Sequence, residues 1–121
     1  MLITNVDIIR ADGTAQKDMS VAVKGGRFAY IGKDIPPGEW EEVIDGGGNI
    51  LIPGLVNSHT HVPMTLMRGY GDDMPLESWL FDRIFPFEDK LSAEDVYWGS
   101  LLGIAEMLSS GTTSFSDMSF H

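Results

Sequence analysis

The chain of 121 residues has a mass of 13.3 kDa, which is enough for one domain of modest size. It carries 18 Asp and Glu residues against 8 Lys and Arg residues, a formal net charge of −10. This balance excludes the clustered cations that a nucleic acid or an anionic membrane surface would require. Cysteine is absent, so any metal ion must be held by nitrogen and oxygen ligands.

The composition is that of a globular protein, with 43% hydrophobic and 21% charged residues. No apolar run approaches the roughly 20 residues that a membrane-spanning helix needs. The first residues lack a basic segment followed by an apolar stretch, which is the pattern of a signal peptide. We therefore expect a cytoplasmic protein with a small-molecule substrate, and neither nucleic acid nor membrane as a partner.

The first half of the chain is typical of β structure. Short runs rich in β-branched residues occupy residues 2–10, 20–24, 27–31 and 42–45. Gly25 and Gly26 separate two of these runs, and a Gly-Gly pair favours a two-residue hairpin because both positions tolerate positive φ. We expect several small antiparallel strands and no helix before residue 50.

In the second half of the chain the spacing of the apolar residues changes. Residues 55–61 indicate a short buried strand, and a long connection follows in which residues 76–85 form a short helix that Pro86 ends. A longer helix over 92–110 leads to a strand over 112–116. The order strand, helix, strand over 54–118 is one βαβ unit and implies a parallel pair of strands. The composition shift near Pro53 is the one candidate domain boundary.

The helix over residues 92–110 carries its own start and stop signals. Ser92 is a natural N-cap, Asp95 stands at the capping-box position, and Gly111 suits the residue after the C-cap. An apolar stripe is expected to face the core, comprising Leu101, Ala105 and Leu108 with Ile104 and Met107 beside it.

His59 and His61 form the sharpest chemical feature of the sequence. Residues two apart in a strand point to the same face, so both imidazoles can reach one metal ion at about 2.0–2.1 Å. The alternative is a chance pair that makes ordinary hydrogen bonds. The position at the end of an apolar strand, before a long loop, favours the site, because α/β proteins place their sites at such strand ends.

These residues stand inside a longer recognisable pattern. The run Ile52-Pro53-Gly54-Leu55-Val56-Asn57-Ser58-His59-Thr60-His61 resembles the opening signature of the amidohydrolase superfamily, and the approach Asp45-Gly46-Gly47-Gly48 resembles its preceding small domain. Further segments are similar to the branch that holds 5-methylthioadenosine/S-adenosylhomocysteine deaminases and related triazine hydrolases. They are Met64–Tyr70, Trp79-Leu80, Phe85–Glu88, Gly111–Thr113 and Asp117-Met118, together with Asn57 where many members have Asp.

The resemblance implies an α/β fold in two parts. Residues 1–52 would form part of a small β-sandwich domain, and residues 53–121 the first βαβ portion of a (β/α)₈, or TIM-like, barrel of a metal-dependent hydrolase. Such a barrel takes about 250 residues, so the chain is expected to be a fragment of a larger protein. We expect the isolated chain to be inactive and not to be a stable monomer; its partners would be further copies of itself or the missing remainder of the protein.

The same resemblance implies a hydrolytic deaminase of adenosine-like nucleosides with one divalent metal ion, commonly zinc and sometimes iron. His59 and His61 match the first two metal ligands, and Glu88 matches a residue that binds the ribose hydroxyls. Metal-bound hydroxide would attack the amino-bearing ring carbon, and ammonia would leave. The Glu and His that transfer protons in the family, and its remaining metal His and Asp, would lie beyond residue 121, so no catalytic residue is assigned in this chain.

Other interpretations stay open. The substrate could be another aminated heterocycle, such as a triazine or guanine, converted by a chlorohydrolase or deaminase, or the chain could be a non-catalytic fragment. Glu88 could be a solvated acid, and His121 a terminal histidine rather than one at the mouth of the site. Arg68 could clamp substrate or pair with Asp72 or Asp73. The aromatic residues Trp79, Phe81, Phe85 and Phe87 could be packing or a base-stacking platform, and Asp72, Asp73 and Glu77 a solvated acidic face.

Overall fold

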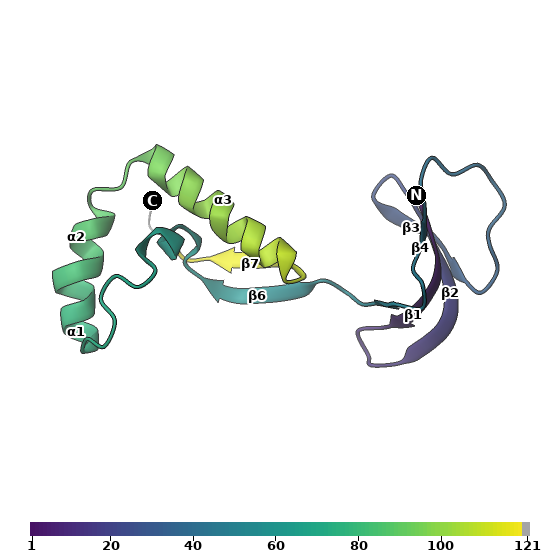
Figure 1. Cartoon of the computed structure of the whole chain (residues 1–121), viewed down its shortest axis with the longest axis horizontal. Helices are drawn as coiled ribbons and strands as arrows, with labels where there is room; N and C mark the ends of the chain where they lie inside the picture. The colour runs from purple at the N-terminus through teal and green to yellow at the C-terminus, as the bar shows by residue number, and fades with distance from the viewer. Residues whose placement is uncertain (120–121) are drawn as a thin grey trace. The chain divides into compact units, whose positions relative to one another are not determined.

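The computed structural model describes residues 1–119 and shows a mixed α/β chain that divides into two compact units. One unit is Met1–Pro53, and the other begins at Gly54. Each is described by itself below (Figure 1). No helix in residues 1–119 is both long enough and apolar enough to cross a bilayer.

The first unit is a five-stranded sheet. Its strands are β1 (Leu2–Ile9), β2 (Ala15–Lys24), β3 (Arg27–Gly32), β4 (Val43–Asp45) and β5 (Ile50–Leu51). They follow the order β3-β2-β1-β4, and β5 also pairs with β1. Gly25 and Gly26 have φ angles of 56° and 72° and join the antiparallel pair β2–β3, which confirms the predicted hairpin.

The expectation of antiparallel strands is correct for β1, β2 and β3 but wrong for β4, which runs parallel to β1. Strand β5, which was not among the expected strands, also runs parallel to β1. After β3 the chain crosses back along residues 33–42, so that β4 starts at the same end of the sheet as β1. A three-residue strand carries no sequence signal for its direction, because apolar side chains suit either orientation. The direction is set by the connection instead.

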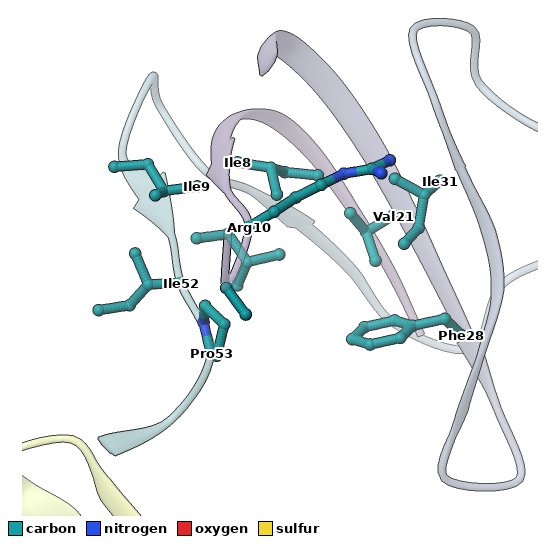
Figure 2. Close-up of a pocket in the computed structure, with 10 residues that line it drawn as sticks. Ile8, Ile9, Arg10, Val21, Phe28, Ile31, Ile52 and Pro53 are labelled. Carbon is teal, nitrogen blue, oxygen red and sulfur yellow. The ribbon is translucent and has the colours of Figure 1, made fainter. Parts of the chain in front are cut away.

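The core of this unit centres on strands β1 and β2. Val6, Ile8, Met19 and Val21 are buried together, and Leu51 packs against them. A hollow of about 290 Å³ opens beside this cluster. Figure 2 shows Ile8, Val21 and Ile31 around the hollow with the Arg10 side chain extending across it; its other labelled lining residues are Ile9, Phe28, Ile52 and Pro53.

The second unit contains the βαβ arrangement that the sequence predicts. Strand β6 (Leu55–Thr60) and strand β7 (Thr112–Asp117) are parallel neighbours, and helix α3 (Ala93–Ser109) connects them along the strand pair (Figure 1). Between β6 and α3 the chain forms a 3₁₀ helix, η1 (Val62–Met67), and then a longer helical segment. The first barrel repeat of the expected fold remains a prediction.

Pro86 does not end that helical segment, contrary to the prediction. Helix α1 (Leu76–Ser78), the π-helical turn η2 (Trp79–Ile84) and helix α2 (Phe85–Glu88) follow one another directly. A proline inside an α-helix clashes with the carbonyl four residues earlier. The wider π turn before Pro86 relieves that crowding, and the proline falls in the first turn of α2, where it is tolerated.

Helix α3 begins and ends as predicted. The Ser92 and Asp95 side chains form a reciprocal capping box, and Gly111 follows the C-cap with a φ of 86°. The predicted apolar stripe is wrong, however, because Leu101, Ala105 and Leu108 are exposed. The buried positions are Gly99 and Gly103, and Ile104 and Met107 are half-buried. Two glycines on the inner face let η1 approach closely, which an apolar-stripe rule does not detect.

Strand β6 is not buried as predicted. Leu55 and Val56 are exposed, and Asn57 and Thr60 are half-buried. In the described part of this unit the sheet has two strands and one long helix against it, which leaves much of both faces without a covering layer.

Candidate metal centre

His59 and His61 lie at the carboxyl end of β6. His59 is the next-to-last residue of the strand, and His61 follows it as the N-cap of η1. Their ring centroids are 5.5 Å apart with an interplanar angle of 71°. His59 is exposed and His61 half-buried. The structure therefore brings the two imidazoles together on one side of the strand end, as the i, i+2 spacing predicts.

Backbone and side-chain hydrogen bonds fix the chain on either side of these histidines. The Asn57 side-chain oxygen accepts from the His59 N–H at 3.3 Å. The Thr60 carbonyl accepts from the Met118 N–H at 2.9 Å, which joins the ends of β6 and β7. The Asp117 carboxylate accepts from the Val62 N–H at 2.8 Å. Both neighbours of His61 are thus held by the end of β7.

Helix η1 is pressed against α3 directly after the histidines. The Thr65 hydroxyl donates to the Gly99 carbonyl at 2.7 Å. A Cβ on Gly99 would come within 2.8 Å of the Pro63 carbonyl oxygen, and one on Gly103 within 2.8 Å of Val62 Cγ1. Such distances show that only glycine fits at these two positions without movement. Sequence reasoning missed both, although their i, i+4 spacing on one helix face was a usable signal.

Arg68, the residue after η1, adds an ion pair with Glu106 of α3 to the contact between η1 and α3. Its guanidinium donates two hydrogen bonds to the Glu106 carboxylate, at 2.7 and 3.0 Å. Of the two interpretations of Arg68, pairing with Asp72 or Asp73 is wrong, because the carboxylate that it contacts is Glu106 on α3. The hydrogen bond from Arg68 lowers the pKa of Glu106, and the bond to Glu106 raises the pKa of Arg68. Asp72, Asp73 and Glu77 are exposed, as expected of a solvated acidic face.

Glu88 is the last residue of α2 and is half-buried. Its neighbour Phe87 lies against Tyr70, with ring centroids 5.3 Å apart, and the Arg83 guanidinium lies 5.7 Å from the Tyr70 ring. These contacts tie the segment that carries Glu88 to the loop after η1. Phe81 and Phe85 meet edge to face with ring centroids 5.5 Å apart and are both exposed, whereas Phe87 pairs with Tyr70. Phe87 therefore belongs to a different ring pair from Phe81 and Phe85.

The donor set suits zinc in kind. Imidazole nitrogens are preferred zinc ligands, and the histidine pair would supply two of the four positions of a tetrahedral site. Within residues 1–119, no group of three or more His, Asp or Glu side chains is placed to hold a metal ion, so Glu88 does not join the pair there. His121 lies outside the described residues.

Comparisons with known proteins give this geometry a context. Residues 50–121 match the sequence model of the amidohydrolase family. The chain is 47% identical over 122 residues to a 5-methylthioadenosine/S-adenosylhomocysteine deaminase of Carboxydothermus hydrogenoformans, an alignment that covers 99% of this chain and 28% of the relative. It is 49% identical over 121 residues to a 5'-deoxyadenosine deaminase of Methanothermobacter thermautotrophicus, covering 100% and 28%.

Solved structures agree with this placement. An adenosine deaminase of Xanthomonas campestris with bound zinc matches with a TM-score of 0.88 and 35% identity, over 98% of this chain and 28% of that one. A zinc complex of an atrazine chlorohydrolase from Arthrobacter aurescens matches with a TM-score of 0.85 at 24% identity, over 96% and 28%, and so shows the fold alone. The chain spans 28% of the length of each of these relatives. Since the matched region contains the histidine pair and covers more than half of the sequence, the chain belongs to the amidohydrolase family.

Proposed function

We propose that these residues serve a metal-dependent hydrolytic deaminase that acts on adenosine-like nucleosides of the S-adenosylhomocysteine and methylthioadenosine kind. The observation that carries the proposal is the convergence of the His59 and His61 rings at the end of β6. It occurs in a chain that is 47% and 49% identical, along essentially its whole length, to deaminases of such nucleosides.

His59 and His61 would hold the metal ion, and zinc is the first choice because the adenosine deaminase structure that is 35% identical contains it. The chemistry that zinc supplies when bound is Lewis-acid activation of water for hydrolysis at neutral pH. The chain's own contribution is to hold two imidazoles at a fixed separation. Asn57 and Asp117 fix the backbone on the two sides of the pair, so little ordering is left for the moment of metal binding.

Glu88 would accept hydrogen bonds from the ribose hydroxyls. A carboxylate has two oxygens and can serve two hydroxyl donors at once, through bonds that are stronger than those between neutral groups. The contacts of Phe87 and Arg83 with Tyr70 restrain the segment on which Glu88 lies. Glu88 is half-buried, so water competes less for its carboxylate than at an open surface.

The experiment is a substrate comparison in the protein as expressed from its own gene. Rates are measured with S-adenosylhomocysteine, methylthioadenosine and 5'-deoxyadenosine, and with bases that carry no ribose. Glu88→Ala should lower kcat/KM for the nucleosides about 10- to 100-fold, since a charged hydrogen bond contributes about 1.5–3 kcal/mol, and should change ribose-free bases little. Asp89→Ala, at the neighbouring exposed carboxylate, is the matched control. Equal losses on both substrate classes contradict the role of Glu88.

A second candidate is deamination of a ribose-free heterocycle. The structure of a guanine deaminase from C. acetobutylicum with bound guanine matches with a TM-score of 0.75 and 27% identity, over 94% of this chain and 28% of that one. The same assay separates the two candidates. Turnover of guanine or a triazine together with no turnover of any nucleoside would refute the nucleoside proposal.

A further inference from the structure

Asp117 lies at the end of β7 and reaches across to the chain that leaves the histidine pair. Its carboxylate Oδ1 accepts a hydrogen bond of 2.8 Å from the backbone N–H of Val62, the residue directly after His61. The two partners are 55 positions apart in the sequence. Strand pairing sets this meeting, because Thr60 and Asp117 are aligned in the parallel pair β6–β7.

The Val62 N–H has few other hydrogen-bond acceptors within reach. Val62 is the first residue of η1, and the first N–H groups of a helix have no partner inside it. Pro63 has no N–H, and the Met64 N–H already bonds to the His61 carbonyl at 3.0 Å. Val62 is only 3% exposed, so water has little access to its backbone. Asp117 therefore acts as a cap supplied by the neighbouring strand, in place of an N-cap side chain.

We propose that Asp117 is a positioning residue for the metal centre: it fixes where the chain turns after His61 and thereby holds the His61 ring opposite the His59 ring. This inference rests on the proposed function, in which the two imidazoles bind a metal ion. Asp117 acts through the Val62 backbone and touches neither metal nor substrate. This role requires an acceptor oxygen within hydrogen-bonding distance of the Val62 N–H, and the negative charge of the carboxylate is secondary.

That requirement gives a sharp set of variants. Asp117→Asn keeps an oxygen at the same reach, Asp117→Ala removes it, and Asp12→Ala is the control. Asp12 also accepts a hydrogen bond from a backbone N–H, that of Thr14 at 2.9 Å, and its removal changes the charge equally, but it lies in the Met1–Pro53 unit.

Three measurements are made on the protein as expressed from its own gene. Without metal, hydrogen exchange of the Val62 amide and nuclear Overhauser effects between the two imidazole rings report the positioning directly. With Zn²⁺ alone, competition against a chelator reports affinity. Asp117→Ala should speed Val62 exchange about tenfold or more and weaken Zn²⁺ binding about 10- to 100-fold, the range for outer partners of metal ligands. Asp117→Asn and Asp12→Ala should keep the Val62 exchange rate and the Zn²⁺ affinity of the parent protein.

The outcomes separate the two ideas. If Asp117→Asn loses Zn²⁺ as strongly as Asp117→Ala, the carboxylate charge or direct ligation is responsible and the positioning role is overturned. It is also overturned if Asp117→Ala leaves Val62 exchange and the ring contact unchanged. If the parent protein binds no Zn²⁺, the proposed function fails, and the measurements without metal alone decide whether Asp117 holds the rings together.

Discussion

Replacing Gly99 with alanine should loosen the packing of η1 on α3. The added Cβ would lie 2.8 Å from the Pro63 carbonyl oxygen and 2.9 Å from Leu66 Cγ. The oxygen belongs to the backbone of η1 and cannot rotate away, so η1 must move as a whole. Pro63 is two positions after His61, and the movement therefore reaches the histidine pair.

Two effects of opposite sign decide the magnitude. Alanine is better than glycine inside a helix by about 1 kcal/mol. Overpacking of a tight contact costs about 1–3 kcal/mol. Because the clash at Gly99 is with a backbone atom, the overpacking cost falls in the upper part of its range, about 2–3 kcal/mol, and the net destabilisation is about 1–2 kcal/mol. At Gly103 the first contact of an added Cβ is a side-chain atom, Val62 Cγ1 at 2.8 Å, so Gly103→Ala should cost less.

Hydrogen–deuterium exchange of peptides from α3 is the suitable assay, because it reports this unit separately from residues 1–53. A loss of 1–2 kcal/mol corresponds to exchange that is about 5- to 30-fold faster. Gly103→Ala serves as the matched comparison, with the same gain in helix propensity. Slower exchange in Gly99→Ala than in the parent protein, or a larger effect at Gly103, would refute the steric reasoning.

Two further predictions concern the chain as a whole. Hydrogen bonds hold the pKa values of Glu106 and Asp95 below their ordinary values of 4.5 and 3.8. The stability that these two carboxylates contribute is therefore present above the ordinary pKa values and is lost as the pH falls through the lowered ones. Melting temperatures measured from pH 6 to pH 2 should show this loss, and Glu106→Gln should make the loss smaller. Exposed apolar side chains, such as Phe28 at 70% and Val56 at 71%, should make the 121-residue chain self-associate. Light scattering tests this, and a monodisperse 13.3 kDa species with one sharp melt would contradict it.

Local signals in the sequence predict local structure well. The start of α3 follows from Ser92 and Asp95, which are three residues apart and bond to each other. The hairpin at Gly25 and Gly26 and the pairing of the His59 and His61 rings depend on equally short spacings. In each case the physical cause lies within one turn or one strand, so a single segment of sequence contains it.

Features that depend on distant segments escape such reasoning. The partner of Arg68 is Glu106 on α3 rather than a neighbouring Asp, because η1 determines the direction of its side chain. The face of α3 that turns inward is the one that contacts η1. Gly99 and Gly103 lie on this face, whereas Leu101 and Leu108 are exposed. Glu88 is indicated only by a resemblance of sequence motifs, and within residues 1–119 it does not join the two histidines in a group of three that could hold a metal ion.

The contact of Asp117 with Val62 depends both on a pattern that the sequence predicts and on a strand register that it does not. The sequence predicts that the strands around 55–61 and 112–116 are parallel, and parallel strands place their carboxyl ends at one edge. This rule is compatible with a carboxylate near the histidines at the end of the second strand, but it does not select one. Which residue such a carboxylate meets depends on register, and the β6–β7 pairing shifts between Leu55 and Val56 and again between Asn57 and Thr60. The two shifts cancel, because Thr112 pairs with Leu55 and Asp117, five residues later, pairs with Thr60, also five residues later. Asp117 is therefore level with Thr60, and its carboxylate is within reach of the Val62 N–H two residues further on. This contact is determined by the pairing of two strands that are far apart in the sequence, which no single segment contains.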